Sequence, residues 1–292
     1  MLVLLVLLLV VGCTFLVYRF STKITGEGID DVDTTPPSDT STIKKRESRV
    51  VRIQDSEHVF FDVHIPPEYP VYHSLNQDYP GLERLQISDG PPISLVHDFL
   101  SDHEADFLID VAESCVSRSL VGGEIESAGR TSESCYLEQD ALPGLMEKVT
   151  SLTGKPLAHC EYPQVAKYVA GQEYGLHYDG FSHQGGPTGR NELTLGGNRI
   201  ATVLIYLNNV SEGGETHFPH MDLKIRPTKG TALIFFPSTA NGEFDVQTLH
   251  AALPAVDTKY VSQIWVREST FTGNPRKPPK HLSPEEVAGW YS

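Results

Sequence analysis

Cysteine is scarce in this chain, and several patterns that identify large classes of protein are missing. The 292 residues include 4 cysteines, and none of them forms the Cys-x-x-Cys pairs of a structural zinc site. No repeat of fixed period occurs, which argues against a solenoid or a propeller. We therefore expect an ordinary folded domain without a zinc ribbon or a repeat array.

Positive charge is also in short supply. The chain has 23 Lys and Arg against 38 Asp and Glu, a formal net charge of −15. An excess of negative charge repels a phosphate backbone, so nucleic acid is not an expected partner. The hydrophobic fraction of 39% is close to that of globular proteins. The length suits one catalytic domain with an N-terminal extension.

The first residues form the longest apolar run of the chain. Residues 1–18 carry no ionised side chain, and this length predicts an uncleaved membrane anchor helix over 1–20, with a cleaved signal peptide as the alternative. Arg19 and Lys23 favour a cytosolic domain, whereas the glycosylation acceptor at Asn209 favours a lumenal one. We expect anchoring in the endoplasmic reticulum with the catalytic domain in the lumen, a cytosolic orientation being the alternative.

A polar stretch separates the anchor from the rest of the chain. Residues 21–50 are rich in Thr, Ser, Asp and Pro and are predicted to be a disordered tether, which leaves 51–292 as the catalytic domain. In an oxidising compartment, Cys115, Cys135 and Cys160 allow one disulfide, and the sequence does not choose the pair.

The secondary-structure pattern of the predicted catalytic domain changes near its middle. Residues 92–155 are predicted to be mainly helical, because Ser101 and Glu104 resemble a capping box and Pro143 suits the first turn of a helix over 142–152. Residues 160–270 contain short β-branched and aromatic runs separated by turns. The pattern predicts an α+β, β-rich fold with a barrel or jelly roll behind N-terminal helices.

His177 and Asp179 are the strongest candidates for metal ligands. They are two residues apart, so on a strand both side chains point to the same face. His250, on a later strand-like segment, supplies a third ligand. Two imidazoles and one carboxylate bind one face of octahedral Fe(II) and leave positions open. A zinc hydrolase is equally compatible with these three residues.

Lys259 distinguishes the two metal chemistries. It follows His250 by nine positions and begins a strand-like run. A dicarboxylate cosubstrate needs a buried cation for its distal carboxylate, and a buried lysine without such a partner is costly. The alternative is an exposed lysine at the start of a strand.

The stretch 95–268 resembles the catalytic domain of prolyl 4-hydroxylases, in the 2-oxoglutarate dioxygenase superfamily. Five linked motifs carry the resemblance: Gly129-Arg130-Thr131-Ser132, QVAKYVAGQEYGLHYD, RIATVLIYLNNVSEGGETHFP, KGTALIFF and LHAALPAVDTKYVSQIW. It implies a double-stranded β-helix (jelly-roll) core. It also implies Fe(II), 2-oxoglutarate as cosubstrate, O2, and ascorbate as reductant.

Carried over by position, the resemblance makes His177, Asp179 and His250 the iron ligands and catalytic residues. Lys259 becomes the partner of the 2-oxoglutarate C5 carboxylate, and the hydroxyls of Tyr168 and Thr202 help to hold the cosubstrate. A lysine at this position is typical of prolyl 4-hydroxylases, although the interval from His250 is shorter than usual. Tyr168 and Thr202 have an alternative interpretation, as an aromatic and a β-branched residue that only pack within strands.

The implied reaction is hydroxylation of proline in a peptide or protein, of the procollagen type, with conversion of 2-oxoglutarate to succinate. The substrate groove is expected to be edged by Tyr174, Tyr178 and Trp265, and by a glycine-rich flap over 181–198. Two alternatives stay open: an oxygenase that acts on another side chain or a small molecule, and a non-catalytic membrane-tethered binding module. The oligomeric state is not predicted.

Overall fold

The computed structural model describes most of the predicted catalytic domain. The described residues are 49–54, 60–65, 73–76, 84–120, 129–275 and 277–291. The predicted anchor lies outside them, and so does the predicted tether, except for Arg49 and Val50. Within the described ranges no helix is long and apolar enough to span a bilayer. β1 (Arg49–Gln54) and β2 (Phe60–Ile65) form an antiparallel pair of their own.

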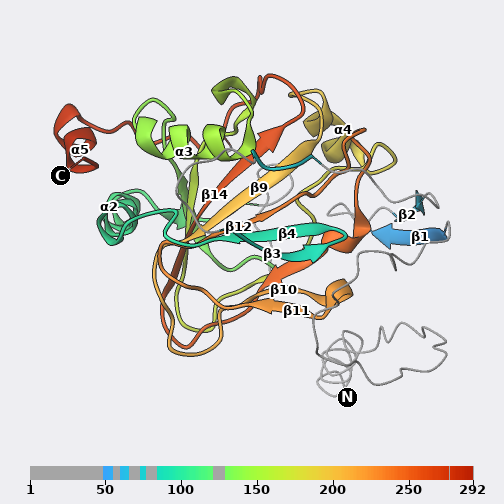
Figure 1. Cartoon of the computed structure of the whole chain (residues 1–292), viewed down its shortest axis with the longest axis horizontal. Helices are drawn as coiled ribbons and strands as arrows, with labels where there is room; N and C mark the ends of the chain where they lie inside the picture. Colours follow the sequence, from blue (N-terminus) through green and yellow to red (C-terminus); the bar gives the residue numbers. More distant parts are fainter. Residues whose placement is uncertain are drawn as a thin grey trace, which may run out of the picture. The chain divides into compact units, whose positions relative to one another are not determined.

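An eight-stranded sheet forms the centre of the fold, and all its neighbouring strands are antiparallel (Figure 1). Its strands, in spatial order, are β3 (Arg84–Asp89), β4 (Pro92–Val96), β12 (Ala232–Phe235), β9 (Arg199–Tyr206), β14 (Lys259–Arg267), β7 (Gln164–Tyr168), β6 (Glu133–Tyr136) and β5 (Ser117–Arg118). The prediction of short strands over 160–270 is confirmed in this sheet by β7, β9, β12 and β14. Every residue of β9 is buried, because both faces of this sheet are covered.

A four-stranded antiparallel sheet covers one of these faces. Its strands are β11 (Leu223–Ile225), β10 (Thr216–Phe218), β13 (His250–Ala252) and β8 (Tyr174–His177). From β7 to β14 the chain passes repeatedly between the two sheets, as in a jelly roll, with β10 and β11 as a hairpin within the smaller sheet. Phe218 and Ile225 of the smaller sheet share a buried cluster with Tyr206 and Phe235 of the larger one.

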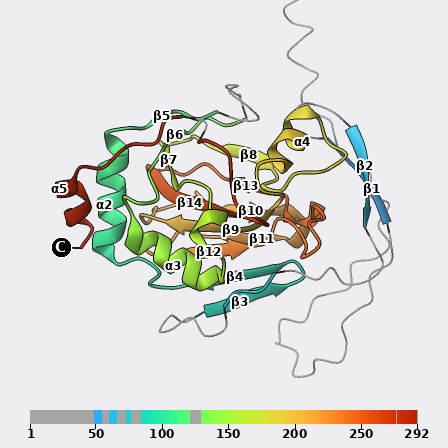
Figure 2. The same ribbon diagram turned by 90° about the horizontal axis from the view of Figure 1, so that it is seen from above.

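Helices cover the opposite face of the larger sheet (Figure 2). α2 (Asp102–Glu113) and α3 (Pro143–Thr153) bury Leu108 and Leu145 in a cluster with Val203 and Ile264 of the sheet. Ser101 and Glu104 form the capping box of α2. The remaining helical segments are short: α4 (Pro187–Leu193), α5 (Pro284–Gly289), and the 3-10 turns η1 (Leu157–His159), η2 (Pro219–Met221) and η3 (Val246–Thr248).

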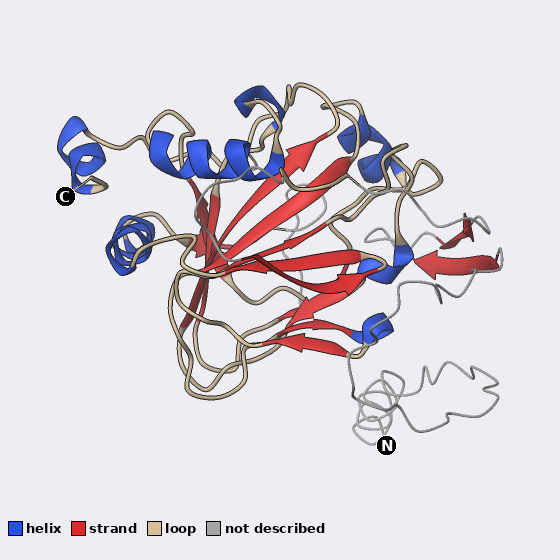
Figure 3. Cartoon of the chain, in the orientation of Figure 1, coloured by secondary structure: helices blue, strands red, loops and turns tan. Residues whose placement is uncertain are grey.

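The structure corrects the prediction of a helical part over 92–155. Three strands of that stretch, β4, β5 and β6, belong to the eight-stranded sheet, so the stretch contains strands as well as the helices α2 and α3. Figure 3 shows helices and strands in separate colours. Phe99 and Leu100, which lie within the predicted helical part, precede α2. Both are almost fully buried, because the segment leading into α2 packs against the core. Apolar spacing alone does not separate such a segment from a helical turn.

Candidate metal centre

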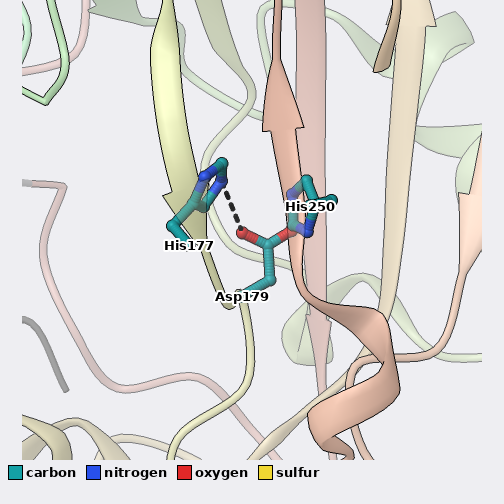
Figure 4. A group of neighbouring side chains, drawn as sticks. All are labelled: His177, Asp179 and His250. Atoms are coloured by element: carbon teal, nitrogen blue, oxygen red, sulfur yellow. Dashed lines mark ion pairs between the residues drawn. The ribbon is translucent and has the colours of Figure 1, made fainter. Parts of the chain in front are cut away.

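Two neighbouring strands of the smaller sheet bring the predicted ligands together (Figure 4). His177, the last residue of β8, lies directly opposite His250, the first residue of β13, and Asp179 follows two residues after β8. The candidate ligand atoms of all three lie within 4.8 Å of one another. Each histidine Nε2 is 3.8 Å from an oxygen of Asp179. The pairing of β8 with β13 thus joins residues far apart in the sequence.

Backbone carbonyls orient both imidazoles. His177 Nδ1 is 2.8 Å from the carbonyl oxygen of Gly175, and His250 Nδ1 is 2.9 Å from that of Thr248. Because a carbonyl only accepts, Nδ1 carries the proton and the lone pair lies on Nε2, which faces Asp179. Burial, together with the charge on His250, lowers the pKa of His177 to about 3. A neutral imidazole is the form that binds a metal.

Asp179 brings negative charge into this site. Its side chain is buried and accepts a 2.8 Å hydrogen bond from the Thr202 hydroxyl at Oδ2. Burial raises its pKa, but the electrostatic effects of His250, His177 and Arg199, together with the Thr202 hydrogen bond, outweigh burial, and the net pKa is lowered. Its carboxylate forms no ion pair with a lysine or arginine in the described part of the chain. A buried carboxylate beside two imidazole lone pairs fits a divalent cation.

Removing the Thr202 hydroxyl tests its role as a support for Asp179. Thr202→Val keeps the shape of this buried side chain and deletes the hydrogen bond, so we expect iron affinity to fall roughly tenfold, as for other groups that orient metal ligands. Isothermal titration of the iron-free protein with Fe(II) under anaerobic conditions measures this. Thr153→Val is the matched control, because it removes a buried hydroxyl bond within α3. Equal affinities of both variants would contradict the assignment.

Lys259 lies at the start of β14, with its side chain almost fully buried. Its Nζ donates to the carbonyl oxygens of Gly214 at 2.9 Å and Leu253 at 3.4 Å, and lies 4.7 Å from the centre of the Tyr168 ring. It forms no ion pair with any described carboxylate. Burial lowers its pKa to about 8, and the charge of Glu215 opposes this shift. An unpaired buried ammonium is suited to an anionic ligand.

The register of β14 with its neighbours β7 and β9 explains which predicted site residues lie on the same face of the larger sheet as Lys259. Tyr168 pairs with Lys259 between β7 and β14, and Thr202 pairs with Trp265 between β9 and β14. Alternation along β14 places Lys259, Val261 and Trp265 on one face, and Val261 belongs to the cluster between the sheets. Tyr168 thus lies beside the lysine, whereas the Thr202 hydroxyl donates to Asp179.

The three aromatic residues predicted to edge a groove have separate neighbours. Tyr174 stacks on the imidazole of the first triad histidine, with ring centres 3.6 Å apart. Tyr178 packs edge to face against Phe244 at 4.7 Å. Trp265 is 6% exposed, and the Arg199 guanidinium lies 3.9 Å from its ring centre. Since Trp265 is covered in this way, it does not line an open groove in this structure.

Sequence reasoning missed a buried ion-pair cluster next to Asp179. Glu161 accepts hydrogen bonds from both Arg199, at 2.7 Å, and Arg267. Arg199 Nη1 lies 3.4 Å from the backbone oxygen of Asp179. Arg267 also pairs with Glu192 at 2.9 Å. The sequence signal for this cluster was an arginine at one end of each of two strand-like runs, Arg199 in β9 and Arg267 in β14. Charged side chains are rarely buried without a partner, so each arginine predicted an acidic neighbour.

Part of the predicted glycine-rich flap is helical. α4 occupies 187–193, with Pro187 in its first turn, a position for which proline is well suited. The Arg267 side chain donates to the backbone oxygens of Glu192 and Gly197 and pairs with the Glu192 carboxylate. The C-terminal end of the flap is thereby attached to β14.

Weakening this attachment should loosen the flap without unfolding the domain. Glu192→Gln removes the ion pair and keeps both carbonyl bonds, so amide exchange in 187–197 should accelerate several-fold, corresponding to about 1 kcal/mol of local stability. Hydrogen exchange measured by mass spectrometry reports this region. The exposed Glu243 supplies the control Glu243→Gln. Unchanged exchange in Glu192→Gln would show that the ion pair does not restrain the flap.

The residues of this site lie in a part of the chain that is similar to known proteins. The model of the 2OG-Fe(II) oxygenase superfamily matches residues 163–267, a range that contains the triad and Lys259. A probable prolyl 4-hydroxylase 6 of Arabidopsis thaliana is 33% identical over 214 residues, which cover 64% of this chain and 72% of the relative. Prolyl 4-hydroxylase subunit alpha-1 of Rattus norvegicus is 38% identical over 189 residues.

The match to the rat subunit covers 62% of this chain but 35% of that relative, so the chain spans about a third of its length. Among solved structures, the viral collagen prolyl hydroxylase of Paramecium Bursaria Chlorella virus-1, in its 2OG complex, aligns with a TM-score of 0.48 at 29% identity. This alignment covers 62% of this chain and 98% of the viral one.

Proposed function

Because the chain belongs to the prolyl 4-hydroxylase family of 2-oxoglutarate and iron(II) oxygenases, we propose that it hydroxylates proline in a peptide or protein and converts 2-oxoglutarate to succinate. The observation that carries the proposal is the pairing of two features: the convergent triad of His177, Asp179 and His250, and the buried Lys259, which forms no ion pair with any carboxylate of the described residues. A zinc hydrolase does not require a buried lysine such as Lys259.

Each residue has a defined part in this proposal. Nε2 of His177, Nε2 of His250 and the Asp179 carboxylate would hold one face of Fe(II), and the Lys259 ammonium would bind the distal carboxylate of 2-oxoglutarate. When bound, iron and 2-oxoglutarate supply the oxidative chemistry that inserts one atom of O2 into a C–H bond. The Tyr168 hydroxyl is the further cosubstrate contact that we propose, because its ring lies beside Lys259.

The protein contributes orientation and a dry site. Backbone carbonyls hold both imidazoles, and Thr202 holds Asp179, so the ligand atoms are arranged before iron binds. The two sheets bury the Lys259 end of the site, which strengthens the attraction between its ammonium and a carboxylate. Tyr174 and Tyr178 are partly exposed and stay candidates for contacts with an extended peptide.

The reaction is tested by supplying substrates to the iron-loaded protein. We expect succinate release to rise when proline-rich peptides, including collagen-like repeats, are added, and mass spectrometry to find one added oxygen on proline. Omission of 2-oxoglutarate should stop both signals. Oxygen addition to another residue would favour the alternative oxygenase, and a folded, iron-loaded protein without any 2-oxoglutarate turnover would favour the binding module. Omission of ascorbate tests its proposed role as reductant.

Affinity for 2-oxoglutarate should fall above pH 8. In the ligand-free protein the pKa of Lys259 is lowered to about 8, so the ammonium is charged below this pH and is lost as pH rises through it. The bound carboxylate stabilises the charged form, and the KM for 2-oxoglutarate should therefore rise about tenfold per pH unit above 8. Steady-state kinetics from pH 6.5 to 9.5 measure the profile. A flat profile would contradict this role of Lys259.

The cellular setting is a proposal of the same kind. We propose an anchor over 1–20, a tether over 21–50, and a catalytic domain over 51–292 in the lumen of the endoplasmic reticulum. The supporting features are the apolar run at 1–18 and the glycosylation acceptor at Asn209. Glycosidase treatment of the expressed protein tests the lumenal orientation, because only a lumenal Asn209 carries a glycan.

A further inference from the structure

Two of the cysteines lie at a junction between a helix and the large sheet. Cys115 directly follows Ser114, the C-terminal cap of α2, and its Sγ donates to the Val111 carbonyl oxygen at 3.4 Å. Cys135 lies in β6 and is buried in the core cluster, against which Cys115 packs. Both are free thiols in this structure.

Strand pairing places the two thiols near each other. Ser117 of β5 lies opposite Ser134 of β6, so Cys115 precedes the pairing point by two residues and Cys135 follows it by one. Cys115 packs against the buried cluster that contains Cys135, and each thiol is the largest influence on the pKa of the other. Cys160 differs, since it is buried near the carbonyl oxygen of Pro156.

We propose that Cys115 and Cys135 form a disulfide in an oxidising environment, and that this bond joins the C-terminal end of α2 to β6. The bridge would close the chain segment that contains Arg130 to Ser132. Arg130 lies 4.7 Å over the ring of Tyr174, which stacks on His177. The disulfide would thus constrain a wall of the proposed iron site, although its formation does not depend on the proposed activity.

The two thiols have unequal reactivity, which defines the order of steps. Cys115 is the more exposed, and contact with Cys135 lowers its pKa against the opposing effect of burial. Contact with Cys115, together with burial, raises the pKa of Cys135. Cys115 is therefore the thiol that ionises first and attacks.

Glutathione disulfide is a sufficient oxidant. The Cys115 thiolate attacks one sulfur of glutathione disulfide, forms a mixed disulfide and releases one glutathione thiolate. Cys135 then loses its proton and attacks the Cys115 sulfur, which releases the second glutathione. Two protein thiols are oxidised to one disulfide, while one glutathione disulfide is reduced to two glutathione molecules.

Peptide mapping of the full chain tests the bond directly. The protein is equilibrated in glutathione buffers from reducing to oxidising, quenched with acid, alkylated and digested with trypsin without reduction. Cleavage after Arg84, Arg118, Arg130 and Lys148 separates Cys115 from Cys135. We expect the peptides 85–118 and 131–148 to become linked in oxidising buffer, while Cys160 is recovered in its alkylated form.

Variants provide the controls and a second measurement. Cys115→Ala should abolish the link and Cys160→Ala should keep it. Oxidation should also raise the unfolding midpoint of the wild-type chain by about 5 to 10 °C, as expected for a loop of this length, and leave Cys115→Ala unchanged. Alkylation of both Cys115 and Cys135 in the folded, fully oxidised protein would overturn the proposal, and so would a link that includes Cys160.

Discussion

Asp179→Asn is expected to abolish 2-oxoglutarate turnover while the fold is retained. Asparagine has the shape of aspartate and can still accept the Thr202 hydrogen bond, but it removes the negative charge that the site offers to iron. We expect turnover to fall by at least about a thousandfold, or about 4 kcal/mol in transition-state free energy. His177→Ala and His250→Ala should have the same effect, because each removes one ligand.

Stability of the iron-free fold should change far less than activity. Neutralisation of Asp179 removes the attraction to Arg199 that helps to lower its pKa, but it also removes the cost of burying the charge, and the Thr202 hydrogen bond is retained. The measurements are succinate formation and thermal unfolding of iron-free protein. Asp222→Asn, at an exposed position with φ of 49°, is the matched control. Wild-type turnover by Asp179→Asn would exclude the carboxylate from the metal site, and unfolding of all three triad variants would assign them a structural role.

Lys259→Ala is expected to raise the KM for 2-oxoglutarate by roughly 10- to 100-fold. A hydrogen bond between charged groups contributes about 1.5–3 kcal/mol, and the buried position of Lys259 makes its charge hard for water to replace. High cosubstrate concentration should recover much of the turnover, because the triad is untouched. The expected signature is therefore in KM more than in kcat.

A second substitution at Lys259 separates the loss of 2-oxoglutarate binding from the loss of side-chain packing. Lys259→Ala also leaves the Gly214 and Leu253 carbonyls without this donor and opens a cavity, whereas Lys259→Met fills the volume without the charge. Both variants should share the raised KM, and Lys224→Ala, at an exposed position of β11, should retain the wild-type value. An unchanged KM in Lys259→Met would mean that the lysine does not bind the cosubstrate.

Four strands of the larger sheet, β7, β9, β12 and β14, were predictable from local pattern. They are rich in β-branched and aromatic residues and stand out against polar turns, and β9 is buried throughout because both faces of the eight-stranded sheet are covered. Within the helical prediction, Ser101 and Pro143 mark helix starts through local capping chemistry. β4, β5 and β6 were missed because their strand character comes from pairing with distant strands, which apolar spacing does not reveal.

The sequence by itself determined the chemistry available to this protein: two histidines and an aspartate at strand-compatible positions, and a lysine nine residues after the last of them. Only the tertiary structure decided their arrangement. The pairing of β8 with β13 sets His177 opposite His250, and burial leaves Lys259 without a carboxylate partner in the described chain. Long-range pairing and burial depend on the whole fold, so no local pattern contains the contact of Arg199 with Trp265 or the packing of Cys115 against the core cluster around Cys135.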